Sequence, residues 1–483
     1  MQSIKTKTAR GIIWSFIERF SVQGIQFIFQ IILARLLSPS DYGIIAMLAI
    51  FMAISQSLID AGFTNALIRK NDRTDLDIST VFYFNIFISI IIFIILFISA
   101  PSISDFYNTP PLVSITRVYA IVLLVNALGA IQKTIYTINI DFKSLAKASL
   151  VAALISGLIG IYFATKGLGA WALVYSAIAN SLITTLIMWI NSAWRPKLAF
   201  SMVSLRQMFA FGSKLMLAGL LNTIYTNLQQ MVIGKKFSKQ DLGYYSRADQ
   251  FAQFPSANIT GIFQRVTYPV LCKLSDNGET LLSAYRKFIR FSAYIIFPLM
   301  LGLAAIAKPL VAIVLGDKWL FAGTILQIIC LSYMWYPIHS INLNVLQVKG
   351  RSDLFFRVEI IKKVVGISIL LMTMQISVIA MAIGTIFSSL IALVINTYYT
   401  KKLLSYGLIQ QLKDLNDIIA ISFISCIPAF IISLKFYNNI IALVISIMLA
   451  IVIYIALSKI FKIGEFLEMT NMIKSKFAKG MNT

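Results

Sequence analysis

Basic side chains inside long apolar segments are the residues of this sequence best suited to chemistry. They are Arg19, Arg117, Lys214, Arg247, Arg265 and Lys308. A charge at the centre of a bilayer costs about 2.5–3.5 kcal/mol on insertion scales, so these side chains need a partner or water. Arginine binds phosphate oxygens through paired hydrogen bonds, and lysine adds a point charge. The pattern predicts a cationic site for an anionic group, with Lys308, beside Pro309, expected at the membrane interface instead.

Polar side chains recur at helical spacing on the same segments. Gln23, Gln26 and Gln30 follow Arg19 in steps of three or four residues, which places them on one helix face. Similar stripes on other segments contain Asn222, Tyr225 and Gln229 after Lys214, Asn258 between Arg247 and Arg265, and Tyr336 with Asn344. We expect these stripes to line one central water-filled cavity. Hydrogen bonding between helices is the alternative explanation.

Each basic residue also has an alternative role at the membrane surface. Arg19 lies about 12 Å into its helix at 1.5 Å per residue, and its side chain can extend to the cytoplasmic surface. Lys214 is shallower, and Arg247 and Arg265 lie near opposite ends of one segment. Arg117 is near the outer end of its segment. At that position, a role as an anchor at the membrane interface is as well supported as a role in a gate of the transport path.

Acidic residues in the apolar segments are candidates for ion coupling, namely Glu18, Asp60 and Asp249. Glu18 is adjacent to Arg19 and therefore faces a different helix, with which it can pair. Asp60 follows Gln56 by one turn and can instead cap its helix or bind Arg69 or Arg73. His339, the single histidine, is expected to be a packing residue. The sequence contains no catalytic, metal-binding or phosphate-loop pattern.

The composition predicts an all-α membrane protein. Hydrophobic residues make up 58% of the 483 residues and charged residues 13%, with a mean hydropathy of +0.82, against about 25% charged residues in soluble proteins. Continuous apolar runs indicate helices, because β-barrel strands alternate. We expect about fourteen transmembrane helices. Their ranges are 11–34, 42–63, 78–100, 112–132, 148–165, 169–191, 208–233, 243–265, 291–315, 320–347, 354–374, 378–399, 417–434 and 438–458.

The distribution of charge predicts the orientation. The net charge is +23, and most lysines and arginines lie in alternate connecting segments. Under the positive-inside rule, this pattern predicts that both termini lie in the cytoplasm. The basic residues therefore serve as topology signals, not as a nucleic-acid surface. The first apolar segment is expected to be retained, and the three cysteines form no disulfide or zinc pattern.

An internal repeat divides the chain. Residues 30–43 resemble residues 230–243, because both end an apolar segment with a basic residue and continue with Ser-x-x-Asp-x-Gly. We predict two six-helix lobes, 1–200 and 201–400, related by an axis along the membrane normal. Residues 401–483 then form two additional helices and a basic cytoplasmic tail.

Several short stretches carry a family resemblance, at 35–43, 60–69, 245–248, 269–271, 315–319 and 349–353. Through their order and spacing the chain resembles the Wzx-like polysaccharide flippases of the multidrug/oligosaccharidyl-lipid/polysaccharide (MOP) exporter superfamily. The resemblance implies transfer of an undecaprenyl-pyrophosphate-linked oligosaccharide across the inner membrane by rocking of two lobes. The implied partners are this substrate, membrane lipids, a polysaccharide polymerase and a chain-length regulator, and no cofactor is implied.

Other functions stay open at this point. An ion-coupled exporter of small molecules or drugs, from the same superfamily, would favour acidic sites over the basic ones that predominate in these segments. A polysaccharide polymerase or ligase would need a large outer loop with reactive side chains, whereas the loops expected here are short. A structural scaffold would not need polar stripes along its helices.

Overall fold

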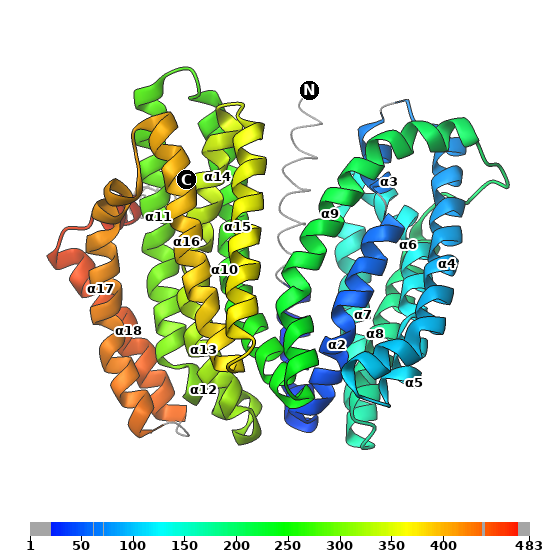
Figure 1. Cartoon of the computed structure of the whole chain (residues 1–483), viewed down its shortest axis with the longest axis horizontal. Helices are drawn as coiled ribbons and strands as arrows, with labels where there is room; N and C mark the ends of the chain where they lie inside the picture. Colours follow the sequence, from blue (N-terminus) through cyan, green and yellow to red (C-terminus); the bar gives the residue numbers. More distant parts are fainter. Residues whose placement is uncertain (1–20, 61, 71, 437–439, 472–483) are drawn as a thin grey trace, which may run out of the picture. The chain divides into compact units, whose positions relative to one another are not determined.

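The computed structural model describes residues 21–60, 62–70, 72–436 and 440–471, and these residues form helices and no strands. Two compact units make up the chain, Met1–Gly243 and Tyr244–Thr483 (Figure 1). After a helix at Ser21–Leu36, the first unit contains α2 (Pro39–Asp60), α3 (Phe63–Arg69), α4 (Asp75–Tyr107), α5 (Leu112–Tyr119), α6 (Ile121–Ile138), α7 (Phe142–Thr165), α8 (Ala170–Asn191) and α9 (Met202–Lys236).

The helix α10 (Lys239–Lys273) begins in the first unit and continues into the second. The second unit then contains α11 (Gly278–Ala305), α12 (Ala307–Leu315), the short 3-10 helix η1 (Asp317–Trp319), α13 (Leu320–Tyr333), α14 (Tyr336–Val348), α15 (Ser352–Thr373), α16 (Val378–Leu404), α17 (Leu408–Lys435) and α18 (Ile440–Ile460). A further helical stretch covers 464–471.

The helices support a protein that crosses the membrane many times, as the composition predicts. In the described ranges, 10 helical segments are long and apolar enough to span a bilayer, or 11 when α9, which bends by 49° between Ala210 and Gly212, is included. The other expected spans correspond to the helix at Ser21–Leu36, to α10 and to α15, which are shorter or more polar. The predicted all-α polytopic fold is confirmed, and the count of about fourteen stays a prediction.

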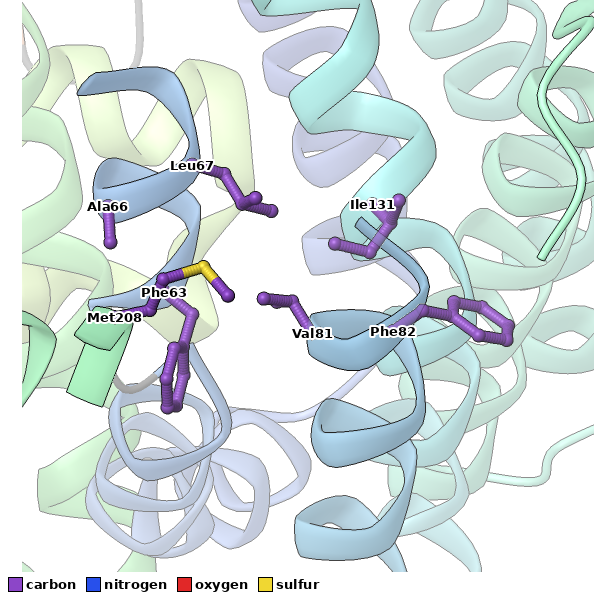
Figure 2. Close-up of a cluster of buried hydrophobic side chains, with 7 residues drawn as sticks. All are labelled: Phe63, Ala66, Leu67, Val81, Phe82, Ile131 and Met208. Carbon is purple, nitrogen blue, oxygen red and sulfur yellow. The ribbon is translucent and has the colours of Figure 1, made fainter. Parts of the chain in front are cut away.

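In the first unit, α7 packs along α8, α6 lies between α8 and α4, and α2 packs along α9. One apolar cluster joins four of these elements and is shown in Figure 2. It consists of Phe63, Ala66 and Leu67 of α3, Val81 and Phe82 of α4, Ile131 of α6 and Met208 of α9. Since lipid is as apolar as these side chains, close packing between the helices, and not removal from water, holds such a cluster together. The cluster therefore fixes the ends of α3, α4 and α9 against one another.

In the second unit, α11 packs along both α13 and α17, and α17 packs along α18 (Figure 1). The helix α16 packs against α13 and α15. The helices beyond residue 401, which the sequence repeat does not include, are thus part of this unit. The lobe ranges 1–200, 201–400 and 401–483 stay a prediction, while the compact units divide between Gly243 and Tyr244.

The repeated sequence folds in the same way twice. One copy ends a helix at Leu36 and begins α2 at Pro39, and the other ends α9 at Lys236 and begins α10 at Lys239. In each copy the serine and aspartate cap the new helix. Ser38 Oγ donates to Asp41 Oδ2 at 2.6 Å, and Ser238 Oγ donates to Asp241 Oδ2 at 2.7 Å. The motif is therefore a matched pair of helix starts.

Candidate functional site

The polar stripe of the first helix lies partly inside the protein. Gln23, Gln26 and Gln30 are half-buried, and the Tyr42 hydroxyl donates to the Gln30 carbonyl oxygen at 3.3 Å. Arg19 and Glu18, predicted for phosphate binding and ion coupling, lie outside the described residues. Their roles stay predictions.

The stripe on α9 runs from an exposed to a half-buried position. Lys214 and Asn222 are exposed, whereas Tyr225 and Gln229 are half-buried. Lys214 follows the 49° bend of α9 by two residues. These side chains stay candidates for lining a cavity.

Asp60 ends a line of hydrogen bonds across three helices of the first unit. Gln56 Nε2 donates to Asp60 Oδ1 at 3.1 Å, and Asn126 Nδ2 donates to Gln56 Oε1 at 3.2 Å. Ser181 Oγ then donates to Asn126 Oδ1 at 2.5 Å. Because every donor in this line points toward the carboxylate, the line stabilises negative charge on Asp60. The guanidinium of Arg73, a partner expected for Asp60, donates instead to the carbonyls of Leu67 and Ile68.

Arg117 is attached to a neighbouring helix. Its Nε donates to the Phe97 carbonyl at 3.3 Å, and its guanidinium carbon lies 4.6 Å from the centre of the Phe97 ring. This cation–π contact ties the end of α5 to α4. Of the two roles considered for Arg117, these contacts favour an anchor over a gate.

In the second unit, Asp249 of α10 accepts a hydrogen bond from the Tyr333 hydroxyl at 2.8 Å. Arg247 is half-buried and Arg265 is exposed. Asn258 donates to the Phe254 carbonyl of its own helix at 2.8 Å. The carboxylate of Asp249 thus joins α10 to the end of α13.

The predicted stripe on α14 divides between two environments. Asn344 is buried and donates to Thr267 Oγ1 of α10 at 3.2 Å, as expected for hydrogen bonding between helices. Tyr336 is half exposed, at 50%. Of these two residues, Tyr336 is therefore the one able to meet a ligand in this structure.

A break between α13 and α14 lies next to Asp249. Pro337 has no N–H for the Tyr333 carbonyl one turn earlier. Ser256 Oγ of α10 donates to that carbonyl at 2.8 Å, and Ser389 Oγ of α16 donates to the Ser332 carbonyl at 3.2 Å. Backbone groups freed inside a membrane must find such partners. Two neighbouring helices therefore hold the break in place.

Ser256→Ala is expected to lower the free energy of unfolding by about 1–3 kcal/mol, because the part-buried Tyr333 carbonyl loses its donor. Thermal unfolding of the purified protein in detergent would measure this change. Ser368→Ala is a matched control, since Ser368 Oγ is exposed and donates only within its own helix, to the Val364 carbonyl. Equal stability of the two variants would show that Ser256 does not support the break.

His339 is a packing histidine, as the sequence suggests. Its Nε2 lies 3.0 Å from Ser389 Oγ and its Nδ1 lies 3.3 Å from Asn396 Nδ2. Both ring nitrogens thus have partners on α16. In the described ranges, no group of three or more His, Cys, Asp or Glu side chains is placed to hold a metal ion.

The sequence analysis missed a basic group on α15. Arg357, Lys362 and Lys363 lie in α15, within the predicted helix 354–374, but are not among the cations named from the sequence. The Lys362 side chain is only 15% exposed and its Nζ lies 2.5 Å from Glu359 Oε1. The signal in the sequence was the presence of four ionisable residues within the predicted helix 354–374. Lys362 is therefore a further cationic candidate for the second unit.

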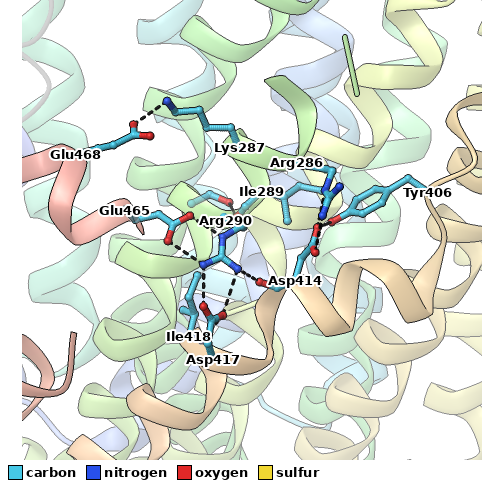
Figure 3. A network of polar contacts seen from close by, with 11 residues as sticks. Arg286, Lys287, Ile289, Arg290, Tyr406, Asp414, Asp417, Ile418, Glu465 and Glu468 are labelled. Carbon is cyan, nitrogen blue, oxygen red and sulfur yellow. Dashed lines mark hydrogen bonds and ion pairs between the residues drawn. The ribbon is translucent and has the colours of Figure 1, made fainter. Parts of the chain in front are cut away.

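A second missed feature is a network of ion pairs at one end of α11, shown in Figure 3. Arg290 contacts Asp417 at 2.8 Å and Glu465 at 2.6 Å, and its guanidinium also donates to the Asp414 carbonyl. Arg286 binds Asp414 through two hydrogen bonds of 2.7 and 2.8 Å. Because the network joins α11, α17 and the stretch 464–471, its role is to hold that stretch on the second unit.

The motif at 349–353 forms a tight turn before α15. Lys349 Nζ donates to the Ser275 carbonyl at 2.9 Å, and Gly350 has a φ of +69°, which favours glycine. Arg351 binds Asp353 at 2.7 Å, and this hydrogen bond lowers the pKa of the exposed Asp353 carboxyl to about 2. The motif is therefore structural in this chain.

Comparison with known proteins places these features in a family. A model of the family described as polysaccharide biosynthesis protein matches residues 32–323, which is more than half of the chain. Teichuronic acid biosynthesis protein TuaB of Bacillus subtilis is 26% identical over 360 residues, covering 74% of each chain. Lipopolysaccharide biosynthesis protein WzxC of Escherichia coli is 25% identical over 401 residues, covering 82% of this chain and 80% of WzxC.

The fold is also similar to solved structures. The lipid II flippase MurJ in an inward closed conformation matches 93% of this chain and 98% of its own, with a TM-score of 0.73 and 18% identity. An inward-facing multidrug transporter of the MOP superfamily matches 81% of this chain with a TM-score of 0.61 and 15% identity. At these identities the likeness concerns the fold. The chain belongs to the polysaccharide biosynthesis protein family, and its fold is similar to that of a MOP superfamily transporter.

Proposed function

We propose that this protein is a flippase that moves undecaprenyl-pyrophosphate-linked oligosaccharides across the bacterial inner membrane for surface polysaccharide synthesis. The observation that carries the proposal is the family match to TuaB and WzxC over most of their lengths. A transport role in polysaccharide biosynthesis follows from this match and from the many apolar helices. The lipid-linked substrate is what the resemblance to the Wzx-like flippases implies, and the basic and polar helix faces suit its charged head group.

Basic and polar residues on several helices support an anionic sugar cargo. Lys214 of α9, Arg247 of α10 and Lys362 of α15 are cations on helices of the transmembrane bundle. With Arg19 they would bind a pyrophosphate, whose oxygens suit arginine and lysine. Amides such as Gln26 would contact sugars, and the polyprenyl tail would stay in lipid. Binding from the cytoplasm and release outside would then follow from alternating access.

The proposed orientation has both termini in the cytoplasm. In this orientation the ion pairs of Figure 3 and the turn at 349–353 lie on the cytoplasmic side, where water reaches charged groups. The two Ser-x-x-Asp-x-Gly turns then lie on the outer side. The orientation agrees with the positive-inside rule, which supports it.

Deletion of the protein, followed by analysis of membrane lipid-linked sugars, tests the function. We expect a pyrophosphate-linked oligosaccharide to accumulate facing the cytoplasm and the surface polymer to be lost. Restoring the unmodified chain should remove the accumulated lipid. Normal polymer without an accumulated intermediate would refute the flippase function and would show that the protein is not needed for this synthesis.

An ion-coupled exporter of small molecules is the second candidate. The hydrogen bonds that end on Asp60, and the bond between Tyr333 and Asp249, favour it because carboxylates of this kind can take up protons or cations. The deletion experiment separates the two functions. An exporter would leave the lipid-linked intermediates unchanged and instead make cells more sensitive to its cargo.

A further inference from the structure

The segment that links α8 to α9 carries apolar side chains on its surface. Residues 192–210 leave the end of α8 and continue through Met202–Ala210, the part of α9 that precedes its 49° bend. We call residues 192–210 the connector. Its large exposed apolar side chains are Leu198, which is 97% exposed, Phe200, Met202, Val203 and Phe209. Contact of such a surface with water is unfavourable, so the surface is suited to a partner.

The other side of the connector is fixed to neighbouring helices of the first unit. Met208 belongs to the apolar cluster of Figure 2, and the Trp194 ring lies 5.8 Å from the Phe82 ring of that cluster. The backbone N–H groups of Lys197 and Ser201 donate to hydroxyls of α4 at 3.1 and 3.0 Å. These contacts hold the connector against the start of α4. The apolar side chains on its exposed side are therefore presented by a firm support.

The neighbours of the connector place it at the membrane surface. The helix α8 is long and apolar enough to cross a bilayer, and so is α9 when its two parts are taken together. A chain that leaves one span, packs against the start of another and then enters the next has to stay close to the head groups. At this depth, exposed apolar side chains can enter the boundary between head groups and acyl chains.

Basic residues accompany the apolar ones. The charged residues in the sequence of the connector are Arg195, Lys197 and Arg206, and all three are exposed. Lys197 Nζ lies 2.7 Å from Asp75 Oδ2 of α4, but both side chains are more than half exposed, and water weakens such a pair. The connector thus keeps a positive charge beside its apolar side chains. This combination is typical of elements that lie on a surface of anionic lipids.

We propose that the connector is a docking surface for the anionic phospholipids of the cytoplasmic leaflet. Its apolar side chains enter the leaflet below the head groups, and its arginines and lysine lie among the lipid phosphates. The choice of leaflet rests on the proposed orientation, and nothing in the inference depends on the proposed cargo. A soluble protein partner is a different occupant, and the position between two spans favours lipid over it. Docking would hold the start of α4 at one depth in the bilayer.

A fluorescent probe on the connector tests the contact with lipid. Leu198→Cys provides the labelling site once Cys272, Cys330 and Cys426 are replaced by serine, and the labelled protein is placed in lipid nanodiscs. Lipids that carry a nitroxide near the glycerol end of the acyl chain should quench this probe strongly, and aqueous iodide should quench it weakly. Asp276→Cys, in the exposed turn between α10 and α11, is the matched control and should show the reverse.

Equal iodide quenching at the two positions would overturn the docking, because the surface around Leu198 would then be open to water. A soluble protein would in that case be the better occupant. Because the measurement does not involve transport, its failure is distinguishable from failure of the proposed function in the deletion experiment.

Thermal unfolding in detergent tests the preference for anionic lipid. Phosphatidylglycerol should raise the unfolding temperature at a lower concentration than phosphatidylcholine does. Lys197→Gln combined with Arg206→Gln should increase the phosphatidylglycerol concentration needed for half of this effect, by about fivefold for each charge removed. Lys435→Gln, which removes an exposed basic residue of α17, is the control and should change nothing. An unchanged lipid requirement in the double variant would overturn the role of these charges.

Discussion

Arg290→Ala is expected to lower the free energy of unfolding by about 3 kcal/mol, the low end of the range for breaking a buried ion pair. The guanidinium lies between the carboxylates of Asp417 and Glu465, at 2.8 and 2.6 Å. The Glu465 side chain is only 8% exposed. Removal of Arg290 would leave the buried Glu465 carboxylate without a positive charge and close to Asp417, whose side chain is 41% exposed, and burial of an unpaired charge is costly. Denaturant or thermal unfolding in detergent would measure the loss.

Lys287→Ala is the matched control, because Lys287 also joins α11 to the stretch 464–471. Its Nζ lies 2.7 Å from Glu468, but the side chains are 55% and 43% exposed. Exposed pairs of this kind contribute about 0–1 kcal/mol, since water screens them. The two variants thus remove a similar contact from different surroundings. Equal losses of stability would contradict the importance we give to burial around Arg290.

The network around Arg290 continues into an uncharged core. Gln411 Nε2 of α17 donates to the Tyr285 hydroxyl of α11 at 3.1 Å and to Asn342 Oδ1 of α14 at 3.0 Å. All three side chains are buried. Satisfied polar networks of this kind fix one arrangement of their helices. We therefore expect α17 to move together with α11 during transport.

The apolar segments could be predicted from the sequence because lipid imposes a simple rule. A transmembrane span needs about 20 apolar residues and an internally hydrogen-bonded backbone. A continuous apolar run such as 86–98 therefore indicates a transmembrane helix. The repeat at 30–43 and 230–243 was also visible, since capping by Ser38 and Asp41 is local in sequence. The structure adds the local role of the repeat, which is to cap the start of one helix in each copy.

Contacts between distant residues could not be predicted. Arg286 and Asp414 are separated by 128 positions, and no pattern in the sequence connects them. Tertiary pairing lowers the cost of a charge in a helix, and composition alone does not show that pairing.

Periodicity predicted helix faces but not their neighbours. The face of α14 that includes Asn344 was identified, yet only the structure shows that Thr267 accepts its hydrogen bond. Likewise, the position of Arg117 near a helix end was clear, but its ring contact with Phe97 was not. Periodic spacing shows only which residues lie on the same helix face. Which helix lies opposite is decided by packing across the whole unit.

Arg19→Ala is expected to reduce polysaccharide export by about 10- to 100-fold. Hydrogen bonds to charged groups contribute about 1.5–3 kcal/mol, and each 1.4 kcal/mol is a factor of about ten. Arg19 heads the stripe of Gln23, Gln26 and Gln30, so loss of its charge would remove the phosphate contact and leave the sugar contacts. Surface polymer and accumulated lipid-linked oligosaccharide, measured at matched protein levels in the membrane, would report the effect.

Arg19→Lys distinguishes the possible reasons for such a loss. Lysine keeps the positive charge but cannot form the paired hydrogen bonds of a guanidinium, so partial activity would indicate that shape matters along with charge. Lys308→Ala is the control, because Lys308 is expected at the interface, and it should export normally. If Arg19→Ala and Arg19→Lys both insert normally and export at the wild-type level, the cationic-site hypothesis is wrong. The polar stripe would then be explained by contacts between helices, as Asn344 and Thr267 already exemplify.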